Sequence, residues 1–166
     1  MHLYIIRHAD AVSLGEQGIR HDEERPLTPK GEAQAEALAR ALGRLGVHFD
    51  ALLTSPLVRA RQTAERLATE SVAAKECPSL APGRKKRQVL ERIRETKGEA
   101  VGIVGHNPDL SELVGWFIGD KKAGIDLDKS GVACIAFEGK PAKGGGVLVW
   151  LVTPEWIAAL CGERGQ

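Results

Sequence analysis

Short apolar runs alternate with amphipathic segments along the first two thirds of the chain. The runs at 2–6, 50–54 and 100–104 have the length of buried strands. Apolar residues at spacings of three and four predict helices at 29–45, 56–69, 84–97 and 108–118. Strands that alternate with helices form mostly parallel sheets with helices on both faces. The sequence therefore predicts an α/β fold, a three-layer sandwich built on such a sheet.

The end of the chain has a different pattern. VACIAFE at 132–138 and VLVWLV at 147–152 predict a C-terminal hairpin around a Gly-rich loop, with a last helix near Pro154. Residues 9–27 are polar and predict a loop. No linker divides the chain, so we expect a single domain over residues 1–166.

Four dipeptides place a capping residue before a proline: Thr28-Pro29, Ser55-Pro56, Asn107-Pro108 and Thr153-Pro154. Proline is tolerated at the first helical position because its missing N–H would have been unpaired there. Each pair therefore predicts the start of a helix.

Three predicted strands end on polar residues, in YIIRHAD, LLTSPLVRARQT and VGIVGHNPDL. The carboxyl ends of neighbouring parallel strands meet at one edge of a sheet, where ligands bind. We therefore expect that edge to gather Arg7, His8, Ser55, Arg59 and His106. Two arginines beside helix N-termini favour a small, multiply charged anion, and phosphate is the natural candidate. An unprotonated imidazole is also a nucleophile that can take up a phosphoryl group.

Composition argues against several other classes of protein. The net charge of +1 and the 4% aromatic content disfavour a nucleic-acid partner. No apolar run reaches the roughly 18 residues of a membrane span. The chain enters its first strand directly after Met1, which does not resemble a signal peptide. The three cysteines are far apart, which predicts reduced thiols in a cytoplasmic protein and no metal-binding pattern.

RHA at 7–9, SPLVRARQTA at 55–64 and GHNPDL at 105–110 closely resemble the histidine phosphatase superfamily, and RPLTPKGEAQA at 25–35 resembles its next landmark. Among its members the chain looks most like the short SixA-type phosphohistidine phosphatases. The resemblance implies a phosphoglycerate mutase-like fold. It also implies that His8 is transiently phosphorylated, that Arg7 and Arg59 hold the phosphoryl oxygens, and that His106 stabilises the transition state. Ser55 and Asn107 complete the expected phosphate-binding set, and no metal or other cofactor is implied.

Two departures from the family pattern concern the backbone and the proton donor. Ala9 stands where the family usually has glycine, so we expect a negative φ at this residue. Many members carry a glutamate at the position that matches Ser79, and acid phosphatases have an aspartate where this chain has Asn107. An alkoxide leaving group needs a general acid, whereas a phosphohistidine with a protonated distal nitrogen releases a neutral imidazole. The missing carboxylate therefore favours an N–P substrate.

The alternative source of a proton is the 9–27 loop, through Asp22, Glu23 or Glu24. Our leading hypothesis is a signalling phosphatase for phosphohistidine in a protein, such as a histidine-containing phosphotransfer domain. The alternatives are a phosphatase or mutase for a small phosphorylated metabolite, and an inactive module that binds phosphoproteins. The basic run RKKR at 84–87 is either a solvated helix start or a docking patch for an acidic phosphoprotein.

Overall fold

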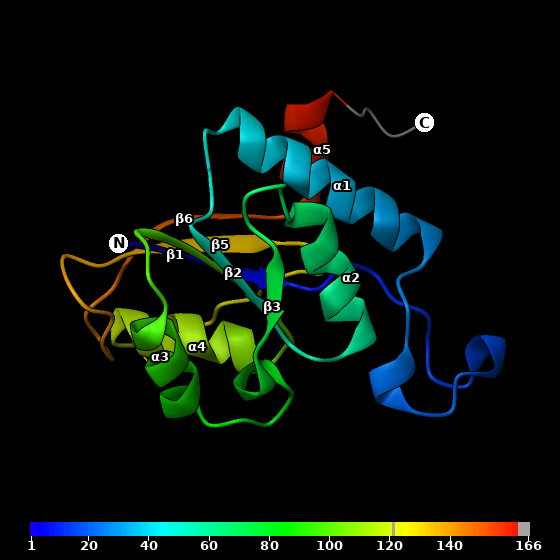
Figure 1. Ribbon diagram of the computed structural model, residues 1–166, viewed down its shortest axis with the longest axis horizontal. Coiled ribbons are helices and arrows are strands. Elements are labelled where there is room, and N and C mark those ends of the chain that lie inside the picture. Colours follow the sequence, from blue (N-terminus) through cyan, green and yellow to red (C-terminus); the bar gives the residue numbers. More distant parts are fainter. Residues whose placement is uncertain (121, 163–166) are drawn as a thin grey trace.

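The computed structural model describes residues 1–120 and 122–162. One six-stranded sheet, in the order β3-β2-β4-β1-β5-β6, runs through the molecule between two layers of helices (Figure 1). β1 to β4 are mutually parallel, and β5 and β6 join antiparallel. The predicted three-layer α/β fold with a C-terminal hairpin is confirmed. The strands are β1 (His2–Arg7), β2 (Ala51–Thr54), β3 (Ala74–Glu76), β4 (Ala100–Gly105), β5 (Val132–Ala136) and β6 (Val147–Val152).

The helices divide between the two faces of the sheet (Figure 1). α1 (Pro29–Arg44), α2 (Val58–Leu67) and α5 (Pro154–Cys161) cover one face, and α3 (Lys86–Glu95) and α4 (Asp109–Ile118) cover the other. Side chains of β1 alternate between the two cores: Leu3 and Ile5 pack in the core that holds α3 and α4, and Tyr4 and Ile6 in the other. Because both faces of β1 are buried, its end has little freedom to move, which suits a strand that carries site residues.

β3 was not predicted from the sequence. It has only three residues, Ala-Lys-Glu, and pairs with β2 at the edge of the sheet. An exposed edge strand of this length carries no apolar alternation, so its pairing depends on the neighbouring strand. Short 3₁₀ turns add Glu16–Gly18 and Asp22–Glu24 in the 9–27 loop, and Pro78–Leu80 before α3.

Of the four Thr/Ser/Asn-Pro dipeptides, two begin a helix as predicted and two do not. Pro29 and Pro154 occupy the first turns of α1 and α5 as predicted, and the Thr28 hydroxyl accepts a hydrogen bond from Gly31 N–H at 3.0 Å. The predictions for Ser55 and Asn107 were wrong: α2 begins at Val58 and α4 at Asp109. The Ser55 hydroxyl lies 2.7 Å from the His106 ring and accepts a hydrogen bond from Leu57 N–H at 3.3 Å, so it does not cap the helix that begins at Val58.

Three further expectations concern the cysteines, a membrane span and the bounds of the domain. Cys77, Cys134 and Cys161 are free thiols. In the described residues, no helix is both long and apolar enough to cross a membrane. The last four residues of the predicted 1–166 domain lie outside the described part of the chain.

Candidate active site

The polar strand ends meet because the three central strands are in register. Arg7 pairs with Gly105 across β1 and β4, and Thr54 pairs with Val104 across β2 and β4. His8, Ser55 and His106 are the next residues on their strands, so they reach the same edge of the sheet. The rings of His8 and His106 lie 5.1 Å apart between centroids. The structure therefore brings together the residues that the sequence predicted would meet.

His8 is buried, and its two ring nitrogens have different partners. Nδ1 lies 2.7 Å from the carbonyl oxygen of Ala9, which can only accept a hydrogen bond, so Nδ1 carries the proton. Nε2 then has a free lone pair, and it accepts a hydrogen bond from Arg59 Nε at 3.2 Å. Burial, helped by the charges of Arg59 and Arg7, lowers the pKa of His8 to about 4. At neutral pH the ring is uncharged and presents a nucleophilic nitrogen to the site.

His106 is held by the hydroxyl of Ser55. Its Nε2 lies 2.7 Å from Ser55 Oγ, and its Nδ1 is buried with no hydrogen-bond partner among the described residues. Burial and the neighbouring His8 lower the pKa of His106 to about 3, so this ring is also neutral. If the Ser55 hydroxyl donates to Nε2, Nδ1 bears the proton and is a free donor. Ser55 therefore positions His106, which is a different role from the helix cap that its sequence context suggested.

Arg7 and Arg59 bring two guanidinium groups to the histidine pair. Arg7 Nη1 donates to the carbonyl of Leu127 at 3.0 Å, while its buried Nε has no partner among the described residues. Buried polar groups without a partner are rare and costly. The unpaired Nε of Arg7 and Nδ1 of His106 therefore mark places where an anion would find donors.

Asp22 occupies the outer end of Arg59. Its Oδ2 accepts from Arg59 Nη2 at 2.9 Å, and its backbone carbonyl accepts from Nη1 at 2.6 Å. Asp22 also accepts from Arg25 at 2.9 Å. Partial burial raises the pKa of Asp22, but the hydrogen bonds from Arg25 and Arg59 outweigh that effect and hold the pKa below its usual range. The 9–27 loop thus places a carboxylate on one arm of the predicted phosphate clamp.

Sequence reasoning missed two groups that support these residues. The buried hydroxyl of Thr63 donates to the carbonyl of Arg59 at 2.7 Å and accepts from Ala9 N–H at 3.0 Å, which ties α2 to the chain beside His8. The carbonyl of Leu127 accepts from both Arg7 and Asn107. Thr63 lies within the SPLVRARQTA motif, so the motif was the available signal. Leu127 supplies only a backbone oxygen, which its sequence does not reveal.

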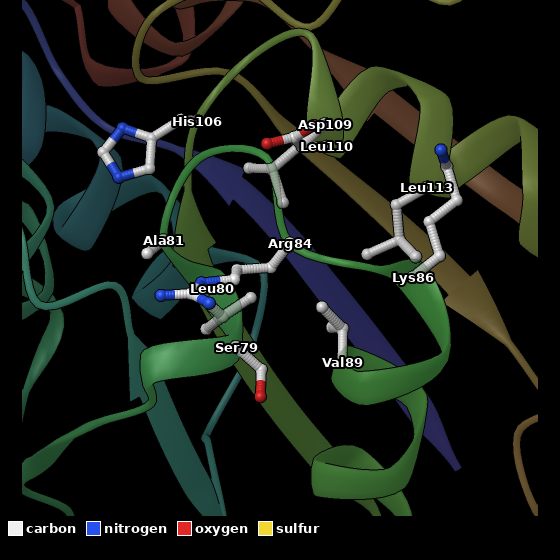
Figure 2. Close-up of a pocket in the computed structure, with 10 residues that line it drawn as sticks. All are labelled: Ser79, Leu80, Ala81, Arg84, Lys86, Val89, His106, Asp109, Leu110 and Leu113. Carbon is white, nitrogen blue, oxygen red and sulfur yellow. The ribbon is translucent and has the colours of Figure 1, made fainter.

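The other predicted positions divide between the site and the scaffold. Asn107 turns its amide away to fold contacts: Nδ2 donates to Leu127 at 2.9 Å and Oδ1 accepts from the Ser111 hydroxyl at 3.0 Å. Ala9 is not among the residues with positive φ, so its methyl group is accommodated as expected. Ser79 lines a cavity beside His106 (Figure 2). The position that matches the family's usual glutamate therefore lies in the lining of this cavity, but its hydroxyl points away from His106 (Figure 2).

Within residues 1–120 and 122–162, no group of three or more His, Cys, Asp and Glu side chains is arranged to hold a metal ion. The charges that face the two histidines come from Arg7 and Arg59, which suit an anion.

A buried pair of neutral histidines and two arginines meet at the carboxyl edge of a parallel sheet, an arrangement suited to binding an anion such as a phosphoryl group. Comparison with known proteins agrees with this. The profile of the histidine phosphatase superfamily (branch 1) matches residues 3–84. An uncharacterized protein of Picosynechococcus sp. is 36% identical over 95% of this chain and 99% of its own length. The mitochondrial serine/threonine-protein phosphatase Pgam5 of Drosophila mojavensis is 34% identical over 49% of this chain and 28% of its own length.

Solved structures show the same fold. The protein histidine phosphatase SixA, complexed with tungstate, has a TM-score of 0.80 at 24% identity and covers 95% of this chain and 99% of its own. An alpha-ribazole-5'-P phosphatase from Escherichia coli has a TM-score of 0.71 at 21% identity, covering 93% of this chain and 97% of its own. The chain belongs to the histidine phosphatase superfamily. This membership supports phosphatase activity and leaves the substrate to be argued from the site.

Proposed function

We propose that the protein is a SixA-type phosphatase that removes the phosphoryl group from phosphohistidine in a protein, through a phospho-His8 intermediate. The observation that carries this proposal is the arrangement around His8: a neutral ring with Nδ1–H on the Ala9 carbonyl, Nε2 facing Arg59 Nε, and buried Arg7 Nε and His106 Nδ1 atoms that have no partner among the described residues.

The reaction balances with these groups alone. The lone pair of His8 Nε2 forms a bond to phosphorus, the P–N bond of the substrate breaks, and its electron pair returns to the leaving imidazole, whose distal nitrogen keeps its proton. Water then attacks phospho-His8, the P–Nε2 bond breaks, and the proton lost by the water leaves with phosphate or solvent. Arg7, Arg59 and His106 stabilise charge on the phosphoryl oxygens in both steps.

The state of Asp22 supports an N–P substrate over a phosphate ester. A general acid must carry a proton, and the pKa of Asp22 is held below its usual range by Arg25 and Arg59. Asp22 is therefore ionised at neutral pH, and the Ser79 and Asn107 positions offer no acid. A neutral imidazole departs without such a donor, whereas an alkoxide does not.

The shape beside His106 supports a protein substrate over a small metabolite. The cavity there encloses about 20 Å³, whereas pockets that enclose small ligands have roughly 300–1,000 Å³. An imidazole presented on a protein surface needs no enclosing wall. The alternative, a phosphatase for a small metabolite, draws support from the similar E. coli structure that is described as an alpha-ribazole-5'-P phosphatase.

The test offers the purified protein a phosphorylated histidine-containing phosphotransfer domain and, separately, a panel of sugar and glycerate phosphates. We expect turnover of the first only, and loss of turnover in His8→Ala. His48→Ala is the matched control, because His48 is exposed and far from the site in sequence. Turnover of the small phosphates alone would support the metabolite phosphatase. Binding of both substrates without turnover by the wild-type protein would support an inactive module.

A further inference from the structure

The cavity beside His106 lies outside the phosphate clamp and combines an apolar floor with a cationic rim. Leu80, Val89, Leu110 and Leu113 line its floor, and Arg84 lines its mouth. In Figure 2 the Arg84 side chain extends across the cavity towards the side where Ala81 and His106 lie. A substrate whose phosphoryl group sits between His8 and His106 would have its flanking atoms next to this rim.

The loop that carries Arg84 is fixed in place. Gly83 N–H donates to Asp109 Oδ2 at 2.6 Å, which ties the loop to the start of α4. Two positions further on, Lys86 pairs with Glu112 at 2.6 Å. Within the described chain, by contrast, no ion pair neutralises Arg84. Asp109 lies in the lining of the same cavity, and its carboxylate accepts the hydrogen bond from Gly83 N–H. Arg84 is thus an exposed cation without an ion-pair partner among the described residues, on a loop that is held at Gly83.

Resting on the proposed function, we propose that Arg84 is a specificity-determining residue that binds a carboxylate next to the phosphohistidine of the substrate protein. The enclosed volume of about 20 Å³ has room for a group of roughly water size, which fits the tip of one acidic side chain. A guanidinium matches a carboxylate in a two-point hydrogen bond, and the apolar floor limits screening on one side. The preferred substrate therefore carries Asp or Glu beside its phosphohistidine.

Arg87 provides a matched control within the same basic run. It carries the same charge and is exposed, but it lines a different cavity together with Leu90 and Trp116. Arg84→Gln and Arg87→Gln change the net charge equally. Any difference between them therefore reports position and not overall attraction between protein and peptide.

The experiment measures binding of two peptides that contain a stable phosphonopyrazole analogue of phosphohistidine, one with Glu and one with Gln beside it, by fluorescence anisotropy. We expect the wild-type protein to bind the Glu peptide about two- to fivefold more tightly, the range expected for an exposed charge pair. Arg84→Gln should lose the preference and Arg87→Gln should keep it. Raising the salt concentration should reduce the preference of the wild-type protein for the Glu peptide.

Equal binding of the two peptides by the wild-type protein, no binding of either, or equal loss of preference in both variants would overturn the role of Arg84. The outcome is separable from that of the proposed function, because this readout needs no turnover. A protein that hydrolyses the phosphotransfer domain yet shows no Glu preference refutes only the Arg84 proposal. One that prefers the Glu peptide through Arg84 yet releases no phosphate refutes only the phosphatase proposal.

Discussion

If Arg59 binds phosphate as proposed, Asp22 competes with phosphate for it, and Asp22→Asn measures that competition. A phosphoryl group bound through Arg59 Nη2 would compete with the contact between Arg59 Nη2 and Asp22 Oδ2, at 2.9 Å. The Asp22 side chain is 49% exposed. An ion pair this exposed is worth about 0.2–1 kcal/mol after solvent screening. Removing the charge should therefore tighten binding of inorganic phosphate by at most about fivefold, since 1.4 kcal/mol corresponds to a factor of ten.

The assay is isothermal titration of phosphate into wild type, Asp22→Asn and Glu24→Gln at neutral pH. Glu24 lies on the same 3₁₀ turn and is exposed, so its variant changes the net charge equally without touching Arg59. Unchanged or weaker phosphate binding by Asp22→Asn would refute the reasoning. Weaker binding would mean that Asp22 holds Arg59 in its working position. The pKa of Asp22 is lowered, so the competition persists at neutral pH and disappears only as pH falls through that lowered value.

Three further predictions concern the support of the site. Thr63→Val should lose about 1–3 kcal/mol of unfolding free energy in denaturant titration and lower kcat, because Ala9 N–H is left buried without a partner, whereas Thr63→Ser should retain both. Gly31→Ala should lower the free energy of unfolding by about 1–3 kcal/mol, because the added Cβ would overlap the carbonyl of Asp10. Gly43→Ala on the same helix adds its Cβ in open space and should be neutral or stabilising. Equal effects of the two substitutions would contradict the close packing of Gly31 against Asp10. Burial lowers the pKa of His8 to about 4, so NMR titration should find the His8 ring neutral down to about pH 5. The free energy of unfolding should decrease as the pH falls from about 6.5, the unfolded pKa, to about 4, the folded pKa. A His8 midpoint near 6.5 would contradict the burial argument.

The central strands and the meeting of their ends were predictable because local pattern determines both. The apolar runs of β1 and β4 identify buried parallel strands, and the rule for parallel sheets places Arg7, His8 and His106 at one edge. β3 was not predictable, because its three residues, Ala-Lys-Glu, show no apolar alternation and gain strand geometry only from pairing with β2. The start of α2 was misplaced because Ser55 bonds a histidine 51 positions away, and local sequence cannot anticipate such a contact.

The loop contacts of the site escaped prediction for the same reason. The sequence suggested Asp22, Glu23 and Glu24 equally as proton donors, and only the folded loop selects Asp22 and turns it to Arg59. The contact with Arg59 also changes the role that Asp22 can have. A carboxylate bound to two arginines is a poor acid, so the residue that was considered as a donor is better understood as an occupant of the anion clamp.

The unpaired polar atoms connect the stability of the fold to its chemistry. Leaving Arg7 Nε and His106 Nδ1 buried without partners costs free energy in the described structure, and a sequence selected for stability alone would not keep both. Both belong to strand-end residues beside His8, so a single anion bound there would satisfy them together. The same burial that makes them costly keeps His8 and His106 neutral and strengthens each charge that faces the site. The proposed nucleophile and the proposed phosphate-binding groups would therefore depend on the same feature, the burial of the strand ends, and a bound phosphoryl group would supply the hydrogen bonds that this burial removes.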